Sequence, residues 1–123
     1  MTVVDSSGWI EYFTNGDLAG RFEAHLADLS AVVTPTIVIY EVYRVMRREL
    51  SEEEATATVA QMQKSRVADL DQFTALTAAD LGLRHGLAMA DAIVYATAVV
   101  NDAELVTADG DFEGLPGVTV YQA

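Results

Sequence analysis

Five acidic residues lie within or next to the predicted structural elements. Asp5 closes an apolar run, Glu41 lies in a helical stretch after a second run, and Asp91 opens an alanine-rich stretch. Asp109 follows a later apolar run, with Asp111 two residues beyond it. Carboxylates that converge repel one another, and their pKa values rise unless a cation intervenes. Hard divalent cations with oxygen ligands are the usual solution.

Such a cluster of carboxylates suits the hydrolysis of a phosphodiester. Two divalent ions can hold both the attacking water and the leaving oxygen. Mg²⁺ or Mn²⁺ would also let a protein with a net charge of −12 hold a phosphate. The sequence contains no cysteine, Gly-rich phosphate loop or nucleophile elbow that would supply a different chemistry. We therefore hypothesise an acidic metal site that activates water.

The elements that must position these acids alternate between short strands and longer helices. Strands are predicted at Thr2–Asp5, Ala31–Thr34, Val67–Leu70, Glu104–Thr107 and Val118–Tyr121. Helices are predicted at Ser6–Phe13, Leu18–Leu29, Thr36–Leu50, Glu52–Lys64, Thr74–His85 and Asp91–Asn101. This alternation implies right-handed crossovers and a mainly parallel sheet covered on both faces. We expect one α/β domain over residues 1–123, with three α/β/α layers and about five strands.

Local signals mark several of the element boundaries. Pro35 suits a junction between a strand and a helix. Ser51 and Glu54 form a capping box, and Gly86 is typical of a helix C-terminus. Ligands of open parallel sheets bind beyond the carboxyl ends of the strands, which is where the acids are expected.

Each acid also has a purely structural interpretation. Asp5 could cap the first helix, Glu41 could pair with Arg44, and Asp91 could be an N-cap. Asp109 could belong to a turn, because glycine follows it. The combination favours a site, since four acids each lie next to a predicted carboxyl edge.

Four ordered motifs resemble those of PIN domains. They are Val3-Val4-Asp5-Ser6-Ser7 with Trp9-Ile10, Glu41 after Thr34-Pro35, Ala90-Asp91-Ala92-Ile93, and Leu105-Val106-Thr107-Ala108-Asp109-Gly110-Asp111-Phe112. Their order and the chain length are similar to those of VapC toxins of type II toxin–antitoxin systems. The resemblance covers nearly the whole chain. It implies a homodimeric, Mg²⁺- or Mn²⁺-dependent endoribonuclease that cleaves RNA and is inhibited by a VapB-type antitoxin protein.

The resemblance also assigns roles to residues. The family's acidic quartet, which is catalytic and binds the metal, is matched by Asp5, Glu41, Asp91 and Asp109. Ser7 matches a small polar position that supports the first acid, and Thr107 matches a hydroxyl position before the fourth. Asp111 has no firm equivalent in the quartet and could assist or replace Asp109.

Basic residues are scarce, with 7 Lys and Arg against 19 Asp and Glu. This balance argues against a surface that binds polyanions in general. Arg44 and Arg48 lie three and seven positions beyond Glu41, so the three share a helix face and predict contacts to RNA. The alternative is a solvated helix end, where arginine also favours the helix dipole.

Two other function classes stay open at this point. An acidic receiver domain has a similar length and architecture, but it needs adjacent acids after its first strand and a late lysine. Here Asp5 precedes serines, and no lysine follows Lys64. A catalytically silent binding module could instead use the acids to receive a basic peptide.

Composition sets the expected compartment. Without cysteine there is no disulfide framework and no thiolate metal site. The first residues lack the basic and apolar regions of a signal peptide. The apolar stretch from Ala92 to Val100 is far shorter than a membrane span of about 20 residues. We therefore expect a cytoplasmic protein.

Overall fold

Short strands and longer helices alternate along the chain, and the computed structural model describes all 123 residues. The strands are β1 (Thr2–Val4), β2 (Val32–Pro35), β3 (Arg66–Ala68), β4 (Glu104–Thr107) and β5 (Val118–Val120). The α-helices are α1 (Ser6–Phe13), α2 (Ala19–Leu26), α3 (Thr36–Glu49), α4 (Glu52–Met62), α5 (Gln72–His85) and α6 (Met89–Val100). Two 3₁₀ turns, η1 (Leu29–Ala31) and η2 (Gly110–Phe112), precede β2 and β5.

All five strands run parallel in one sheet with the order β3-β2-β1-β4-β5. The chain moves outward from β1 to β3 and then returns to the other side of β1. Val3 consequently pairs with both Val33 and Leu105. The boundary between β1 and β4 is therefore the point where the strand order reverses, which is the usual ligand-binding crevice of open α/β sheets.

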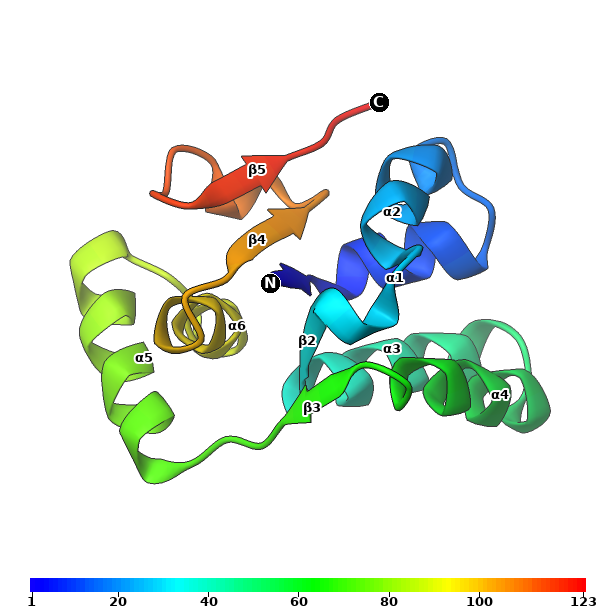
Figure 1. Cartoon of the computed structure of the whole chain (residues 1–123), viewed down its shortest axis with the longest axis horizontal. Helices are drawn as coiled ribbons and strands as arrows, with labels where there is room; N and C mark the ends of the chain where they lie inside the picture. Colours follow the sequence, from blue (N-terminus) through cyan, green and yellow to red (C-terminus); the bar gives the residue numbers. More distant parts are fainter.

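Helices cover both faces of the sheet, as right-handed crossovers require. Figure 1 shows α1 to α4 on one side of the strands and α5 with α6 on the other. The first group connects β1, β2 and β3, and the second connects β3 to β4. The predicted three-layer α/β/α fold with a parallel five-stranded sheet is confirmed.

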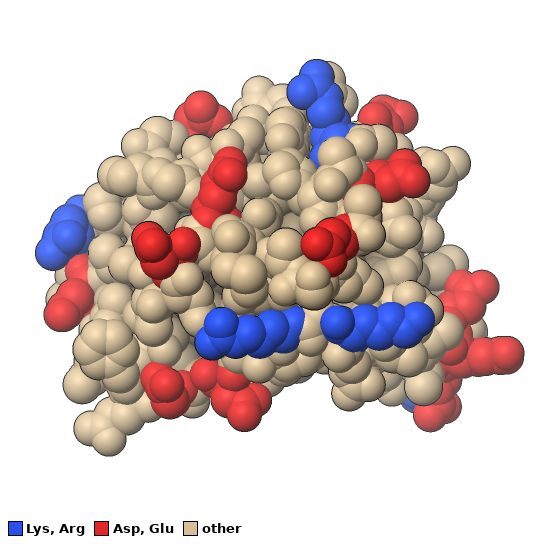
Figure 2. Space-filling model, viewed as in Figure 1, with Lys and Arg blue, Asp and Glu red and all other residues tan.

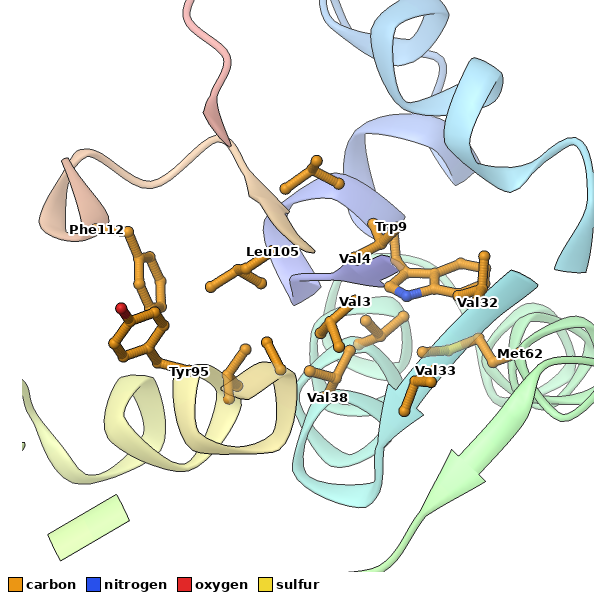
Figure 3. Packing of buried hydrophobic residues seen from close by; sticks show 14 of the residues in the cluster. Val3, Val4, Trp9, Val32, Val33, Val38, Met62, Tyr95, Leu105 and Phe112 are labelled. Atoms are coloured by element: carbon orange, nitrogen blue, oxygen red, sulfur yellow. The ribbon is translucent and has the colours of Figure 1, made fainter. Parts of the chain in front are cut away.

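The apolar core lies on both faces of the three central strands. Both valines of β1 are inaccessible to solvent, as are the two that begin β2 and the central Leu105 and Val106 of β4. Such continuous apolar runs are typical of strands buried on both faces. Figure 3 shows Trp9 packed on one side of β1 and Tyr95 with Phe112 on the opposite side.

Helix α6 packs against β1, β2 and β4 and is rich in small side chains. Its buried residues include Ala92, Ala96 and Ala98. Tyr95 is only 4% exposed and donates a hydrogen bond of 2.8 Å to the carbonyl of Pro116. The ring of Tyr95 therefore fills the core, and its hydroxyl supports the β5 side.

Most helix boundaries differ from the predicted ones by one to three residues, and two of them show why. The helix expected to reach Leu29 ends at Leu26, because the Asp28 carboxylate accepts the backbone N–H of Ser30 at 3.1 Å and starts η1. The helix expected to begin at Asp91 begins at Met89, after an extended Ala88. Sequence pattern fixes a helix boundary only within a few residues, since several polar groups compete for the free backbone N–H groups.

Three predicted boundary signals are confirmed. Pro35 closes β2 and immediately precedes α3. The Ser51 hydroxyl accepts the backbone N–H of Glu54 at 3.0 Å at the start of α4. Gly86 ends α5 with φ at 68°, a left-handed conformation that glycine adopts without strain.

No single helix is long and apolar enough to cross a membrane, and α5 with α6 reaches that length only across a bend of 114°.

The N-terminal turn of α1 needs glycine for steric reasons. A Cβ atom on Gly8 would lie 2.6 Å from Cδ1 of Phe22 and 2.8 Å from Cγ1 of Val4. We expect Gly8→Ala to lower the free energy of unfolding by about 1–3 kcal/mol, because overpacking outweighs the helix propensity of alanine. Thermal or urea unfolding measures the change.

Gly20→Ala is the matched control for this substitution. Gly20 is also helical and has no atom within 4 Å of the added Cβ. It should stabilise the protein by about 0.5–1 kcal/mol through helix propensity. A Gly8→Ala protein as stable as the wild type would contradict the close packing of α1 on α2.

Candidate acidic site at the carboxyl edge of the sheet

The ends of β1 and β4 bring the first and last predicted acids together. Asp5 directly follows β1, and its backbone N–H donates to the carbonyl of Val106 in β4 at 3.0 Å. Asp109 lies two residues after β4, at the N-cap of η2. Both acids therefore occupy the crevice where the strand order reverses.

Asp5 is the most deeply buried of the acids and is 4% exposed. Thr107 donates its hydroxyl to Oδ2 of Asp5 at 2.7 Å, and Ser7 donates to the same oxygen at 3.3 Å. Burial raises the pKa of Asp5, and the hydrogen bond from Thr107 is the largest opposing effect. The two hydroxyls thus support the carboxylate form of a side chain that the core would otherwise protonate.

The same hydroxyls also accept hydrogen bonds from the chain that follows β4. Ser7 Oγ accepts the backbone N–H of Ala108 at 2.9 Å, and Thr107 Oγ1 accepts that of Asp109 at 3.0 Å. The oxygens of Ser7 and Thr107 lie 3.2 Å apart. This network holds the start of α1 against the end of β4, and it fixes the backbone that carries Asp109.

Glu41 and Asp91 approach the crevice from the two helical layers. Glu41 is half-buried on α3, and burial followed by the charge of Asp5 raises its pKa. Ser6 opposes that increase through its hydroxyl, a contribution that the sequence pattern did not single out. Asp91 lies in the first turn of α6, where burial, then Asp109 and Asp5, raise its pKa to about 6.

Asp111 belongs to the same group of side chains. Asp91, Asp109 and Asp111 can each offer a carboxylate oxygen within 4.8 Å of the others, which is close enough to share a metal ion. The Asp109 side chain also accepts the backbone N–H of Asp111 at 2.9 Å. The structure therefore brings all five predicted acids to one edge, with Asp111 exposed at its rim.

The structural interpretations of the individual acids have mixed outcomes. Asp91 is not an N-cap, because Ala88 holds that position. Asp5 is at the N-cap of α1, but its side chain makes no capping hydrogen bond. Glu41 makes no ion pair with Arg44, whereas Asp109 does cap η2 through its bond to Asp111. Only Asp109 has a local structural role that accounts for its carboxylate.

The basic residues of α3 lie beyond Glu41 on the exposed side of the helix. Arg48 forms an ion pair of 2.9 Å with Glu49, and Arg47 forms one of 3.0 Å with Glu52. Arg44 is exposed and has no carboxylate partner. Of the two arginines expected to contact RNA, Arg44 is thus free to bind a ligand, and Arg48 would first have to leave Glu49.

Removing one charge from the acid cluster should stabilise the protein in the absence of metal ions. The raised pKa of Asp91 means that ionisation favours unfolding as the pH rises from about 4 to about 6. In EDTA, Asp91→Asn should match the wild type near pH 4 and exceed it above pH 6. The gain should be roughly 1–2 kcal/mol after allowance for solvent screening.

Melting temperatures between pH 4 and pH 8 measure this difference. Asp80→Asn on the exposed face of α5 is the matched control and should show no such pH dependence. An Asp91→Asn protein that is destabilised equally at every pH would contradict repulsion among the acids.

Comparisons with known proteins agree with this architecture. The PIN domain family matches residues 2–118. No curated protein matches the sequence. Among solved structures, the chain is similar to a toxin–antitoxin complex from Klebsiella pneumoniae, with 25% identity, a TM-score of 0.85 and full coverage of both chains.

Two further solved structures share the fold at lower identity. VapC20 from Mycobacterium tuberculosis, described as a Sarcin-Ricin loop cleaving toxin, is 22% identical with a TM-score of 0.79 and 98% of each chain covered. The DNA-bound VapBC complex from Salmonella typhimurium is 19% identical with a TM-score of 0.73, covering 98% of this chain and 96% of that one. The family match spans nearly the whole sequence and confirms the predicted resemblance, so this chain belongs to the PIN domain family.

Proposed function

We propose that the protein is a metal-dependent endoribonuclease of the VapC type. The observation that carries this proposal is the convergence of acids from both helical layers at the β1–β4 crevice. The pKa values of Asp5, Glu41 and Asp91 are all raised, and no arginine or lysine contributes to any of these shifts. Such an uncompensated cluster of carboxylates suits hard divalent cations.

Asp5, Glu41, Asp91 and Asp109 are the proposed ligands, with Asp111 beside them. Carboxylate oxygens are the donors that Mg²⁺ and Mn²⁺ prefer, and the three aspartates outside the core can share one ion. When bound, the metal would lower the pKa of water and stabilise the charge that develops on the phosphate. Ser7 and Thr107 keep Asp5 oriented, so they are proposed as positioning residues.

The nucleophile in this proposal is water. Ser7 and Thr107 donate hydrogen bonds to Asp5, a proposed metal ligand, and accept backbone N–H groups, so both hydroxyls are engaged in holding the site together. His25 is engaged with the hydroxyl of Tyr121 at 2.8 Å, and His85 packs edge-on against Tyr95. No cysteine is present in the chain. The acids are therefore the groups available to organise an attack on phosphate.

The similar structures support the choice of substrate and partner. VapC20 is described as a cleaving toxin, and the other structures are toxin–antitoxin complexes. We accordingly propose RNA as the substrate and a VapB-type antitoxin as the protein partner.

A homodimer and a cytoplasmic location stay predictions. The single PIN domain over residues 1–123 is also proposed, since the family match ends at residue 118.

The structure separates this proposal from a receiver domain. Receivers of this architecture have the strand order 2-1-3-4-5, with β1 next to β3 at the reversal point. Here β1 lies between β2 and β4. Asp5 is therefore joined by acids of the β4 region, and the receiver alternative does not fit. A catalytically silent binding module would keep the same acids but would not cleave RNA.

The chain, purified free of any partner, should cleave RNA with Mg²⁺ or Mn²⁺ and stop when EDTA is added. Asp5→Asn should lower the rate by more than the roughly 10–100-fold typical of residues that only support a ligand. Asp80→Asn is the control and should cleave normally. Gel analysis of a mixed cellular RNA measures cleavage. Full activity in EDTA would contradict the metal mechanism, and failure to cleave any RNA would favour the silent module.

Arg44 and Arg48 are proposed to contact the RNA backbone. Replacing both with alanine should weaken RNA binding and reduce its dependence on salt, because fewer counterions are released. Binding titrations at several salt concentrations, carried out in EDTA, measure the slope. Arg21→Ala is the control. Arg21 packs over the ring of Tyr121, and its loss should leave the slope unchanged. Identical slopes before and after the double substitution would exclude these arginines from the RNA path.

A further inference from the structure

Positive charge is concentrated at one hollow on α3. The hollow has a volume of about 410 Å³ and is lined by Tyr40, Tyr43, Arg44, Arg47 and Arg48. Three of the seven basic residues in the chain therefore lie within five positions. On the face shown in Figure 2, acidic and basic side chains are interspersed. Two of these arginines are paired with glutamates, so Arg44 is the arginine of this hollow that an anion can approach.

Tyr40 presents an aromatic ring to solvent beside these arginines. It is 64% exposed and is the most exposed tyrosine of the chain. Tyr12, by contrast, packs edge-on against Phe13, and Tyr121 packs against Phe22. The Tyr40 ring has no such aromatic partner within the protein. An exposed ring next to cationic side chains is the arrangement on which single-stranded nucleic acids stack their bases.

Arg44 is the cation that can act together with this ring. It is one helical turn beyond Tyr40, and side chains at that spacing are neighbours on a helix surface. The guanidinium groups of Arg47 and Arg48 are engaged by Glu52 and Glu49, whereas Arg44 has no acidic partner. One helix face thus offers a flat apolar surface and a free guanidinium, which match the base and the phosphate of one nucleotide.

The hollow and the acidic site share helix α3. Tyr40 precedes Glu41, whose pKa is raised by the charges of Asp5, Asp91 and Asp109. Successive side chains on an α-helix diverge by about 100°. Glu41 therefore faces the acid cluster while the neighbouring Tyr40 faces solvent.

We propose that this hollow binds one unpaired nucleotide of the RNA, with its base on Tyr40 and a phosphate on Arg44. This inference rests on the proposed RNA hydrolysis and adds a nucleotide-binding site on α3, outside the acids. Bases within a double helix are stacked on both sides and cannot lie on the ring, whereas bases of loops and single strands can.

Binding of a short fluorescent oligoadenylate to the full chain in EDTA tests the site without cleavage. Tyr40→Ala should weaken binding about 10-fold, because loss of one stacked base has an effect of that order. Tyr40→Phe keeps the ring and should bind within about 2-fold of the wild type. Tyr12→Ala is the matched control, since Tyr12 is 38% exposed on α1 and should leave binding unchanged.

An abasic oligomer of the same length separates stacking from charge. Tyr40→Ala and the wild type should bind it equally, because it offers no base. Arg44→Ala should weaken binding of both oligomers, and its effect should shrink at high salt, whereas the effect of Tyr40→Ala on oligoadenylate should persist. A loss that is equal for the two oligomers in Tyr40→Ala would show a structural effect and overturn the stacking site.

These measurements distinguish failure of the proposed nucleotide site from failure of the proposed nuclease activity. Equal binding of oligoadenylate by the wild type and Tyr40→Ala overturns the nucleotide site, even if the protein cleaves RNA. A protein partner would then be the remaining occupant of the hollow. Ring-dependent binding without metal-dependent cleavage supports the nucleotide site and overturns the nuclease proposal alone. Absence of any RNA binding overturns both.

Discussion

Burial of the carboxylates at the β1–β4 junction, together with the repulsion among them, is the constraint on which the arrangement of the molecule depends. Asp5 is buried, and Glu41, Asp91 and Asp109 add further negative charge around it. No basic side chain contributes to the shifted pKa values. The rest of the chain must hold these groups together against an electrostatic force that separates them. The rigid parallel sheet and its hydrogen-bonded hydroxyls provide that restraint.

The means of restraint differ between the acids. Asp5 is held by hydroxyls, because Thr107 and Ser7 both donate to it. Asp91 is held by packing, since α6 places small alanine side chains against the sheet and brings its first turn to the crevice. The first turn of a helix also favours an anion through its free N–H groups, although burial and neighbouring charges outweigh that effect on the pKa of Asp91.

The sequence alone was sufficient to predict the layers and the edge where the acids meet. Apolar runs such as those containing Val33 and Leu105 indicate buried strands, and parallel strands present their carboxyl ends together. Side-chain partners were less predictable. The ion pair of Arg48 with Glu49 and the burial of Tyr95 depend on rotamers and on distant segments. The order of the strands likewise depends on long-range packing that no local pattern encodes.

The hydrogen bond from Thr107 to Asp5 has a consequence for the order of events during synthesis. The two residues are 102 positions apart, so the site cannot close while β4 is still absent from the sheet. Contacts between such distant segments form late, because they must first overcome the entropy of closing a long loop. A nascent chain that has reached α6 would carry three of its five clustered acids without the strand that unites them. For an enzyme that acts on RNA, cotranslational assembly of this kind would keep the incomplete chain inert on the ribosome.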